Sequence, residues 1–234
     1  MSKAEEIVFL FDVDNTLLDN DRVTQDLKDH LRREFGPENE ERYWVIFEEL
    51  RAELGYADYL GALQRYRRLN YNEPKLLMMS SFLLEYSFAD RLYAGALSAI
   101  EHVRKWGQTV ILSDGDVVFQ PRKVQRSGLW HAVEERVLIY IHKEQMLDEV
   151  QSRYPAAHYV MVDDKLRILD AMKQQMGDKL TTVFPRQGHY AHDPKNITAY
   201  PAADITIDRI GDLTHYTLPI LLGNTPDMMY DRAL

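Results

Sequence analysis

Residues 7–16, IVFLFDVDNT, are the segment most informative about the fold. Its first five residues form a continuous apolar run, which is too short for a helix and lacks the alternation of a half-exposed strand. Such a run fits a strand that is buried on both faces, as in the middle of a parallel sheet. Because successive side chains of an extended segment point to opposite sides, Asp12 and Asp14 should project the same way where this strand ends.

Short apolar runs of the same kind recur along the chain, at residues 109–112, 137–141, 159–162, 180–184 and 205–207. Stretches with helical periodicity lie between them, at residues 97–106, 117–126, 144–153 and 166–176. This alternation predicts right-handed crossovers and an α/β fold with a Rossmann-like, doubly wound parallel sheet. Ligands of such sheets bind beyond the carboxyl ends of the strands, so the polar residues that follow each strand are the functional candidates.

One long interval, between Asp19 and Leu92, breaks the alternation. It contains helix-period segments at residues 43–54, 59–69 and 74–86 and an apolar spacing at Leu27, Leu31 and Phe35. A helical insert after the first strand is the simplest account. We therefore expect a core formed by residues 1–20 and 91–234 and an inserted domain at residues 21–90. The aromatic residues of this interval should form the insert's own core.

Composition limits the classes of function. The 234 residues carry 28 lysines and arginines against 37 aspartates and glutamates, a formal charge of −9, which predicts no nucleic-acid and no membrane partner. The absence of cysteine excludes disulfides, thiolate metal sites and cysteine nucleophiles. No apolar run approaches the roughly 20 residues that span a bilayer, and the first residues do not resemble a signal peptide. We expect a cytoplasmic protein; its oligomeric state is open.

The acidic pair after the first strand has a chemical use. Two carboxylates held this close repel each other unless a cation lies between them or one keeps its proton. An ionised Asp12 could then attack phosphorus, and a protonated Asp14 could supply a proton to the leaving oxygen. Two aspartates also occur in many ordinary turns, so an ordinary turn is the alternative for this pair alone.

Three further predicted strand ends carry polar groups. Ser113-Asp114-Gly115 follows the second strand and offers a hydroxyl and backbone amides to a phosphoryl oxygen. Lys143 follows the third and can offset negative charge. Asp163 and Asp164 follow the fourth and supply the carboxylate oxygens that Mg²⁺ prefers. An acid pair, a hydroxyl, a lysine and a second acid pair should therefore meet at one edge of the sheet.

With these residues the chain resembles the haloacid dehalogenase (HAD) superfamily of aspartate-nucleophile hydrolases. The resemblance rests on FDVDNT at residues 11–16, ILSDG at 111–115, Lys143, and VDD at 162–164. It implies a Rossmann-like core, a helical cap inserted after the first motif, and Mg²⁺-dependent phosphoryl transfer through an aspartyl-phosphate. Asn15 stands where the family more often has glycine, and Lys143-Glu144 replaces a frequent Lys-Pro.

The resemblance also implies a role for each matching residue. Asp12 would be the nucleophile and a metal ligand, and Asp14 the general acid and base that offers its backbone carbonyl to the metal. Lys143 would orient Asp12 and balance its charge. The remaining roles are substrate binding by Ser113 and Asp114, direct metal ligation by Asp164, and ligation by Asp163 directly or through water.

Members of this superfamily catalyse several different reactions, and the residues present favour some of them over others. Members that cleave carbon–halogen bonds lack the second aspartate, so Asp14 favours a phosphatase that acts on a small phosphorylated metabolite. A sugar-phosphate mutase shares every motif found here, and a non-catalytic binding protein on the same fold is the alternative from another class. The loop at residues 185–192 follows the fifth predicted strand, and either Arg186 or His189 could contact substrate there; a surface loop is an equal alternative.

Overall fold

The computed structural model describes residues 5–69 and 75–223, and these contain one parallel sheet. Its six strands have the order β3-β2-β1-β4-β5-β6, which is the order of a Rossmann-like, doubly wound sheet. The strands are β1 (Glu5–Phe11), β2 (Gln108–Asp114), β3 (Val137–Tyr140), β4 (Ala156–Val162), β5 (Leu180–Pro185) and β6 (Ile205–Ile207). The α/β fold predicted from the sequence is confirmed.

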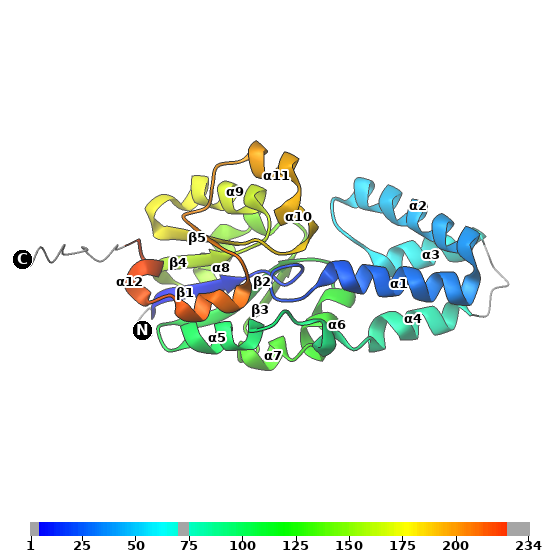
Figure 1. The fold of residues 1–234 in the computed structure, drawn as a ribbon, viewed down its shortest axis with the longest axis horizontal. Coiled ribbons are helices and arrows are strands. Elements are labelled where there is room, and N and C mark those ends of the chain that lie inside the picture. Colours follow the sequence, from blue (N-terminus) through cyan, green and yellow to red (C-terminus); the bar gives the residue numbers. More distant parts are fainter. Residues whose placement is uncertain (1–4, 70–74, 224–234) are drawn as a thin grey trace, which may run out of the picture.

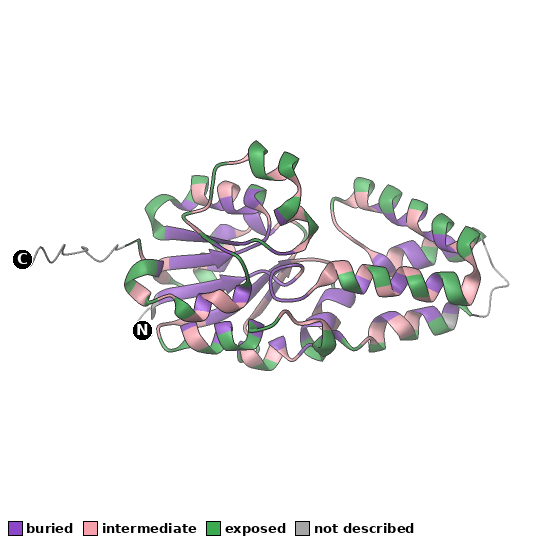
Figure 2. Cartoon of the chain, in the orientation of Figure 1, coloured by how far each residue is buried: buried purple, intermediate pink, exposed green. Residues whose placement is uncertain are grey.

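Strand β1 lies at the centre of the sheet and is buried on both faces. Phe11 pairs with Ile111 of β2 on one side and with Val162 of β4 on the other. Phe9 and Phe11 belong to one hydrophobic cluster, whereas Val8 and Leu10 belong to a second cluster on the opposite face. Figure 2 shows the strands as the most continuously buried part of the chain. This register places the end of β1 between the ends of β2 and β4.

Helices cover both faces of the sheet (Figure 1). The cluster that contains Phe9 also includes residues of α5 (Ala96–Arg104), α6 (Phe119–Arg126), α7 (Leu129–Ala132), η4 (Ile210–His215) and α12 (Leu218–Leu221). The cluster that contains Val8 includes residues of α8 (Leu147–Arg153), α9 (Leu166–Met176) and α10 (Gly188–His192). The remaining short elements are η1 (Phe88–Arg91), η2 (Lys143–Gln145), η3 (Gly177–Lys179) and α11 (Pro194–Ala199).

The helices predicted after β2 and after β3 differ from their periodicity at the start. The helix predicted at 117–126 begins at Phe119, because the Asp116 carboxylate accepts hydrogen bonds from the backbone N–H groups of Val118 and Phe119 and holds a turn there. The helix predicted at 144–153 is divided into η2 and α8. The N–H of Lys143 donates to Asp114 Oδ1 at 2.7 Å, which ties the start of this segment to β2.

The insert is helical, as predicted. It consists of α1 (Asn20–Phe35), α2 (Pro37–Leu54), α3 (Tyr59–Leu69) and α4 (Leu76–Glu85); residue 74 of the last predicted helix lies outside the described residues. Tyr43, Phe47 and Tyr66 are buried between these helices. Figure 1 shows them beside the end of the sheet where β1 leads toward α1. The exact domain limits, including residues 224–234 that are not described, remain a prediction.

Among the described residues, no helix is both long enough and apolar enough to span a lipid bilayer.

Candidate active site

The segment after β1 turns sharply and directs its side chains to the carboxyl edge of the sheet. The N–H of Asp12 donates to the carbonyl of Val162 at 3.0 Å and so continues the pairing beyond β1. The carbonyl of Val13 then accepts bonds from Leu17 and Leu18, which closes the turn. Asn15 has a positive φ of 62°, a left-handed conformation that Asn adopts more readily than most residues. Glycine, which the family more often has at this position, also adopts this conformation readily.

Lys143 lies between two aspartates at the base of the site. Its Nζ is 2.5 Å from Asp12 Oδ1 and 2.6 Å from Asp163 Oδ2, and it also donates to the carbonyl of Leu112 at 3.2 Å. All three charged side chains are buried. A buried ammonium requires such partners, because an unpaired charge in this environment would be costly. The lysine that the sequence placed after the third strand therefore meets the acidic pairs of two other strands.

Asp12, Asp163 and Asp164 form a group that fits a divalent cation. Each offers a carboxylate oxygen, and these oxygens lie within 4.8 Å of one another. Both oxygens of Asp164 are buried and have no hydrogen-bond partner among the described residues. Thr16 organises the group, since its hydroxyl donates to Asp12 Oδ2 at 3.1 Å and accepts from the N–H of Asp164 at 3.0 Å. Hard oxygen donors with an unsatisfied buried carboxylate are what Mg²⁺ or a similar ion needs.

Burial strongly affects the protonation of this group. It raises the pKa of Asp163 to about 6 against the opposing effect of Lys143. Burial also raises the pKa of Asp164 well above its usual value. For Lys143, burial acts to lower the pKa, but the carboxylates of Asp12, Asp163 and Asp114 outweigh it and raise the pKa. The ammonium therefore stays charged, and additional positive charge would favour the ionised forms of the two aspartates.

Asp14 is two residues from Asp12 but has different partners. Its Oδ1 accepts from Lys123 Nζ at 2.6 Å, and Gln120 Nε2 lies 3.5 Å from Oδ2. The side chain of Asp14 is 27% exposed, whereas that of Lys123 is 1% exposed. Among the described residues the group of possible ligands does not include the Asp14 carboxylate. Its predicted contribution to the metal through the backbone carbonyl remains a prediction.

Sequence reasoning missed Lys123 and Gln120, which come from α6. The sequence did contain an indication of this. The buried face of α6 consists of Phe119, Gln120, Lys123 and Val124, which have helical spacing. A lysine at this helical spacing among buried residues needs an anionic partner. Only the tertiary structure identifies that partner as Asp14.

The predicted phosphate-binding segment lies beside this pair. The Ser113 hydroxyl is buried, donates to the carbonyl of Asp114 at 3.2 Å and accepts from Gln120 Nε2 at 2.9 Å. Asp114 Oδ1 accepts from the N–H of Lys143, and burial raises the pKa of this carboxyl group. The structure thus brings Ser113 and Asp114 to the same edge as the aspartates; their roles toward substrate remain predictions.

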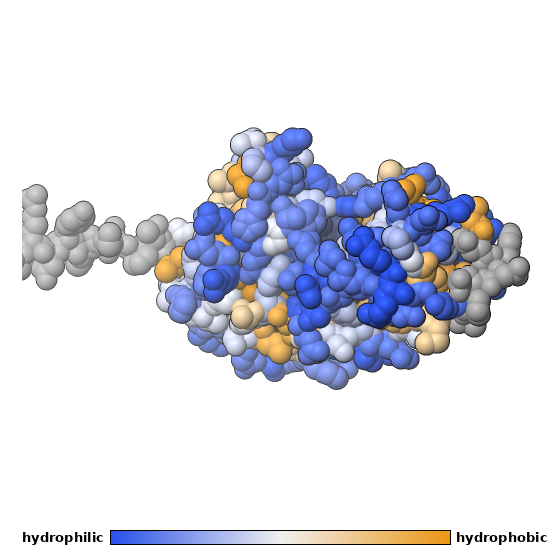
Figure 3. All heavy atoms as spheres, turned by 45° about the vertical axis from the view of Figure 1, so that its right-hand side comes forward, coloured by the Kyte–Doolittle hydropathy of each residue, from blue (hydrophilic) through white to orange (hydrophobic). Residues whose placement is uncertain are grey.

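A cavity of about 590 Å³ lies between the insert and the edge of the sheet. Figure 3 shows that the surface near the junction of the two parts is mostly hydrophilic. The core contributes to the cavity walls Asp14, Asp114, Gln120, Lys123, Lys165 and Arg167. The insert contributes Lys28, Trp44, Phe47, Arg51, Tyr56 and Tyr59. Arg51 of α2 donates to the hydroxyl of Tyr190 in α10, so side chains from both parts meet at this wall.

Arg186 and His189, the two candidates for substrate contact in the loop after β5, have different positions in the structure. His189 lines the cavity, and its backbone N–H and ring Nδ1 both bond to the Asp21 carboxylate, at 2.8 and 2.6 Å. Arg186 pairs with Asp208 and is not among the residues that line the cavity. The structure therefore does not bring Arg186 to the cavity, and its contact with substrate stays a prediction.

The fold and this constellation define a Rossmann-like core with a lysine and a cluster of aspartates at the carboxyl ends of its strands. The chain belongs to the haloacid dehalogenase-like hydrolase family, whose family model matches residues 8–175. A solved haloacid dehalogenase-like hydrolase from Burkholderia xenovorans LB400 is 66% identical; the match covers 92% of this chain and 100% of that one, with a TM-score of 0.87. A comparison with curated proteins gave no match.

More distant structures share the fold. A HAD-hydrolase from Bacillus subtilis bound to magnesium is 17% identical, with a TM-score of 0.59 over 91% of this chain and 98% of that one. The L-2-haloacid dehalogenase from Xanthobacter autotrophicus is 19% identical, with a TM-score of 0.57 over the same shares of the two chains. At these identities the likeness shows the fold alone and leaves the reaction to be argued from the site.

Proposed function

We propose that this hydrolase is a Mg²⁺-dependent phosphatase that cleaves a small phosphomonoester through an aspartyl-phosphate on Asp12. The observation that carries the proposal is that Asp14, two residues after the Lys143-paired Asp12, lines the cavity. A departing halide needs no proton, but a departing alkoxide does. A second carboxylate at this position therefore favours phosphate esters over haloacids.

The metal assignment rests on the donor set. Asp12, Asp163 and Asp164 would hold the ion, and a similar fold from B. subtilis is described as bound to magnesium. When bound, Mg²⁺ supplies positive charge that reduces the repulsion between the Asp12 carboxylate and an incoming phosphate.

The chain's own residues supply the remaining steps. An Asp12 oxygen attacks phosphorus while the bond to the leaving oxygen breaks, and Asp14 gives that oxygen its proton. Asp14 then accepts a proton from a water that attacks the phosphorus, which releases inorganic phosphate and restores Asp12. Lys143 holds Asp12 in place throughout, and the Ser113 hydroxyl donates to the phosphoryl group.

The cavity supports a small metabolite as the substrate. Its volume of about 590 Å³ is in the range of typical small-molecule sites. Lys28, Arg51 and Arg167 provide positive charge on its walls, and Trp44 and Tyr56 provide aromatic surface. A phosphorylated compound with a polar body fits this lining.

The test measures phosphate release from 4-nitrophenyl phosphate with Mg²⁺, and chloride release from 2-chloropropionate, by the same purified protein. We expect phosphate release that stops when a chelator removes the metal, and no chloride release. Asp12→Asn should fold but lose on the order of 10³-fold or more in kcat, because the amide is no nucleophile. Asp178→Asn, at an exposed position, is the control. Chloride release, or phosphatase activity that survives chelation or D12N, would contradict the proposal.

A further inference from the structure

Lys123 is a buried cation that the mechanism above does not use. Its Nζ bonds to Asp14 Oδ1 at 2.6 Å and to Asn20 Oδ1 at 3.0 Å, and it lies 5.2 Å from the centre of the Phe119 ring. The side chain is 1% exposed. An ammonium group loses most of its hydration at such a position, so it is retained only with well-placed acceptors.

These contacts divide the two oxygens of Asp14 between different environments. Oδ1 is taken by a short ion pair with a side chain that is itself held by Asn20 and by the buried face of α6. Within residues 5–69 and 75–223, the partner of Oδ2 is the distant Gln120 amide, at 3.5 Å. Since Asp14 lines the cavity, Oδ2 is the oxygen left to face a ligand. A single strong bond to Oδ1 thus restricts rotation of the carboxylate without covering the other oxygen.

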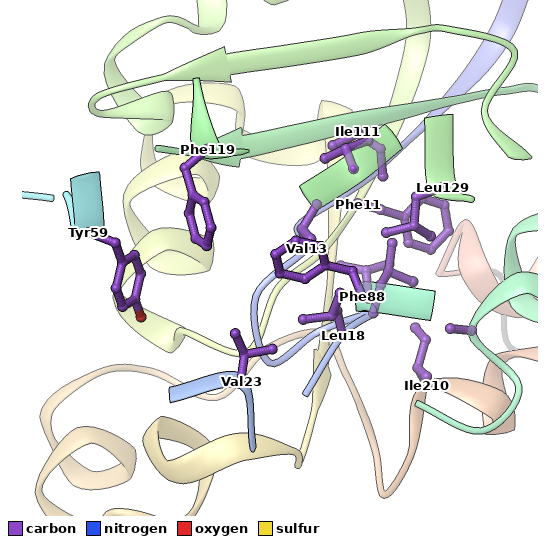
Figure 4. Close-up of a cluster of buried hydrophobic side chains, with 14 of the residues drawn as sticks. Phe11, Val13, Leu18, Val23, Tyr59, Phe88, Ile111, Phe119, Leu129 and Ile210 are labelled. Carbon is purple, nitrogen blue, oxygen red and sulfur yellow. The ribbon is translucent and has the colours of Figure 1, made fainter. Parts of the chain in front are cut away.

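Helix α6 is well suited to hold this lysine rigidly. Beyond the contact with Asn20 at the start of α1, Arg122 donates to the carbonyl of Leu84, and Arg126 donates to the carbonyls of Glu85 and Tyr86. Phe119 of the same helix packs against Tyr59 of α3 with 5.1 Å between ring centres (Figure 4). Helix α6 therefore contacts the insert on several sides while it carries the partner of Asp14.

We propose that Lys123 is a positioning residue, which fixes Asp14 through Oδ1 so that Oδ2 is presented to the leaving oxygen of the substrate. This inference rests on the proposed phosphatase function and extends it. It assigns a task to Lys123 that differs from that of Lys143, which contacts Asp12 and Asp163. Positioning of the proton donor matters most when the leaving oxygen is basic, because a stable leaving anion needs little help from an acid.

The test compares two esters of almost equal shape, phenyl phosphate and 4-nitrophenyl phosphate, which differ in the basicity of the leaving oxygen. We measure kcat/KM for both esters with wild type and Lys123→Met, because kcat/KM reports the step in which the ester bond breaks. K123M should lose roughly ten-fold more activity toward phenyl phosphate than toward 4-nitrophenyl phosphate. An equal loss for both esters would overturn the proposal, since a general disturbance of the fold does not sense the leaving group.

A double-mutant cycle and a control make the assignment specific. In an Asp14→Asn background, K123M should change kcat/KM for phenyl phosphate less than two-fold further. A full additional loss would show that Lys123 does not act through Asp14. Lys173→Met removes a different paired lysine, 2.9 Å from Asp204, and should leave the ratio of the two esters at the wild-type value.

The test must also cover a K123M variant that does not fold and a wild type that hydrolyses neither ester. If K123M does not fold, Asn20→Ala removes an acceptor of the Lys123 ammonium and should shift the ester ratio in the same direction; an unchanged ratio counts against the proposal. If the wild type hydrolyses neither ester, the proposed function fails. In that case, crystal structures of the wild type and of K123M or N20A test the positioning role without any activity measurement. If the Asp14 carboxylate has the same position in the variant as in the wild type, the positioning role of Lys123 is wrong.

Discussion

Asp12 and Asp14 both follow β1 within three residues, yet the structure gives them different surroundings. Asp12 is buried against Lys143 and Thr16, whereas Asp14 lies on the cavity wall against Lys123. Each of the two carboxylates therefore has a lysine of its own that offsets its negative charge. The arrangement keeps one carboxylate fixed at the base of the site and the other at its surface, which suits a nucleophile and a proton carrier.

Asp164 permits a prediction about stability that does not depend on turnover. Its buried carboxylate lacks hydrogen-bond partners among the described residues, so it should destabilise the metal-free protein. Asp164→Asn removes the charge at almost equal size, and the metal-free variant should melt at the wild-type temperature or above it. Mg²⁺ should raise the Tm of the wild type but not that of D164N, because binding to the native state alone is stabilising.

Thermal melts with and without Mg²⁺ check this prediction. Asp178→Asn is again a suitable control, because Asp178 is exposed on η3. A rise in Tm with Mg²⁺ that is as large in D164N as in the wild type would contradict the assignment of Asp164.

The sequence could predict the residues that directly follow strands, and it could not predict those that reach the site from a helix. Asp12, Lys143 and Asp164 follow three different strands, and parallel topology alone brings such positions to one edge. Lys123 reaches Asp14 from more than one hundred residues away along the chain. The partner of Lys123 depends on where α6 packs in the tertiary structure. The local periodicity of the sequence does not predict that position.

At the scale of elements, the segments that were least predictable are those whose ends are set by contacts with other elements. Strand β2 extends through Ser113 and Asp114 because these residues pair with Ile139 and Tyr140 of β3. The start of η2 is set by the bond from Lys143 to Asp114. By contrast, α9 and β6 occupy the residue ranges predicted from the sequence, and each begins and ends on an apolar residue.

The contact between α1 and η1 leads to a prediction about pH. The Asp26 carboxylate in α1 accepts bonds from Arg91 at 2.8 Å and from the hydroxyl of Tyr86. Burial opposes ionisation of Asp26, but the bonds from Tyr86 and Arg91 outweigh it and lower the pKa of Asp26 below its usual 3.8. A folded pKa below the unfolded one means that this contribution to stability is present above pH 3.8 and is lost as the pH falls through the folded pKa.

Asp26→Asn should therefore lower the Tm at pH 7, and the difference from the wild type should shrink as the pH falls below about 4. Melts of both proteins between pH 7 and pH 3 test this. Asp29→Asn, on the same helix and bonded to the neutral amide of Gln25, should follow the wild type across the range. A difference between wild type and D26N that is constant with pH would show that the carboxylate acts by shape and not by charge.

At the scale of the whole molecule, the insert and the core share one continuous hydrophobic cluster. It runs from Phe9 and Phe11 in the sheet to Tyr66 in α3, and the rings of Phe119 and Tyr59 meet where the two parts join. Figure 4 shows this junction, with Val13 and Leu18 of the segment after β1 beside Phe88. Removal of the insert would expose this surface, so a shortened chain is a poor probe of what the insert does.

A shared cluster of this kind predicts that insert and core unfold together. Trp44 lies in α2, whereas Trp106 and Trp130 lie in the core, so fluorescence can follow each part separately. A Trp44→Phe variant reports on the core, and a Trp106→Phe, Trp130→Phe variant reports on the insert. The two urea transitions should coincide in midpoint and in slope, as expected for a single cooperative unit.

Tyr66→Ala tests the coupling directly, because it changes a residue of the insert and none of the core. Tyr66 is 3% exposed within the insert and packs against Tyr43. Loss of a buried aromatic ring should cost about 3 kcal/mol of unfolding free energy. If the continuous cluster couples the two parts, Y66A lowers the midpoint seen by the core tryptophans as much as the midpoint seen by Trp44. A shift confined to the Trp44 signal would mean that the insert unfolds independently. The contacts of α6 with α3 and α4 would then be too weak to hold the insert over Asp14 in a fixed position.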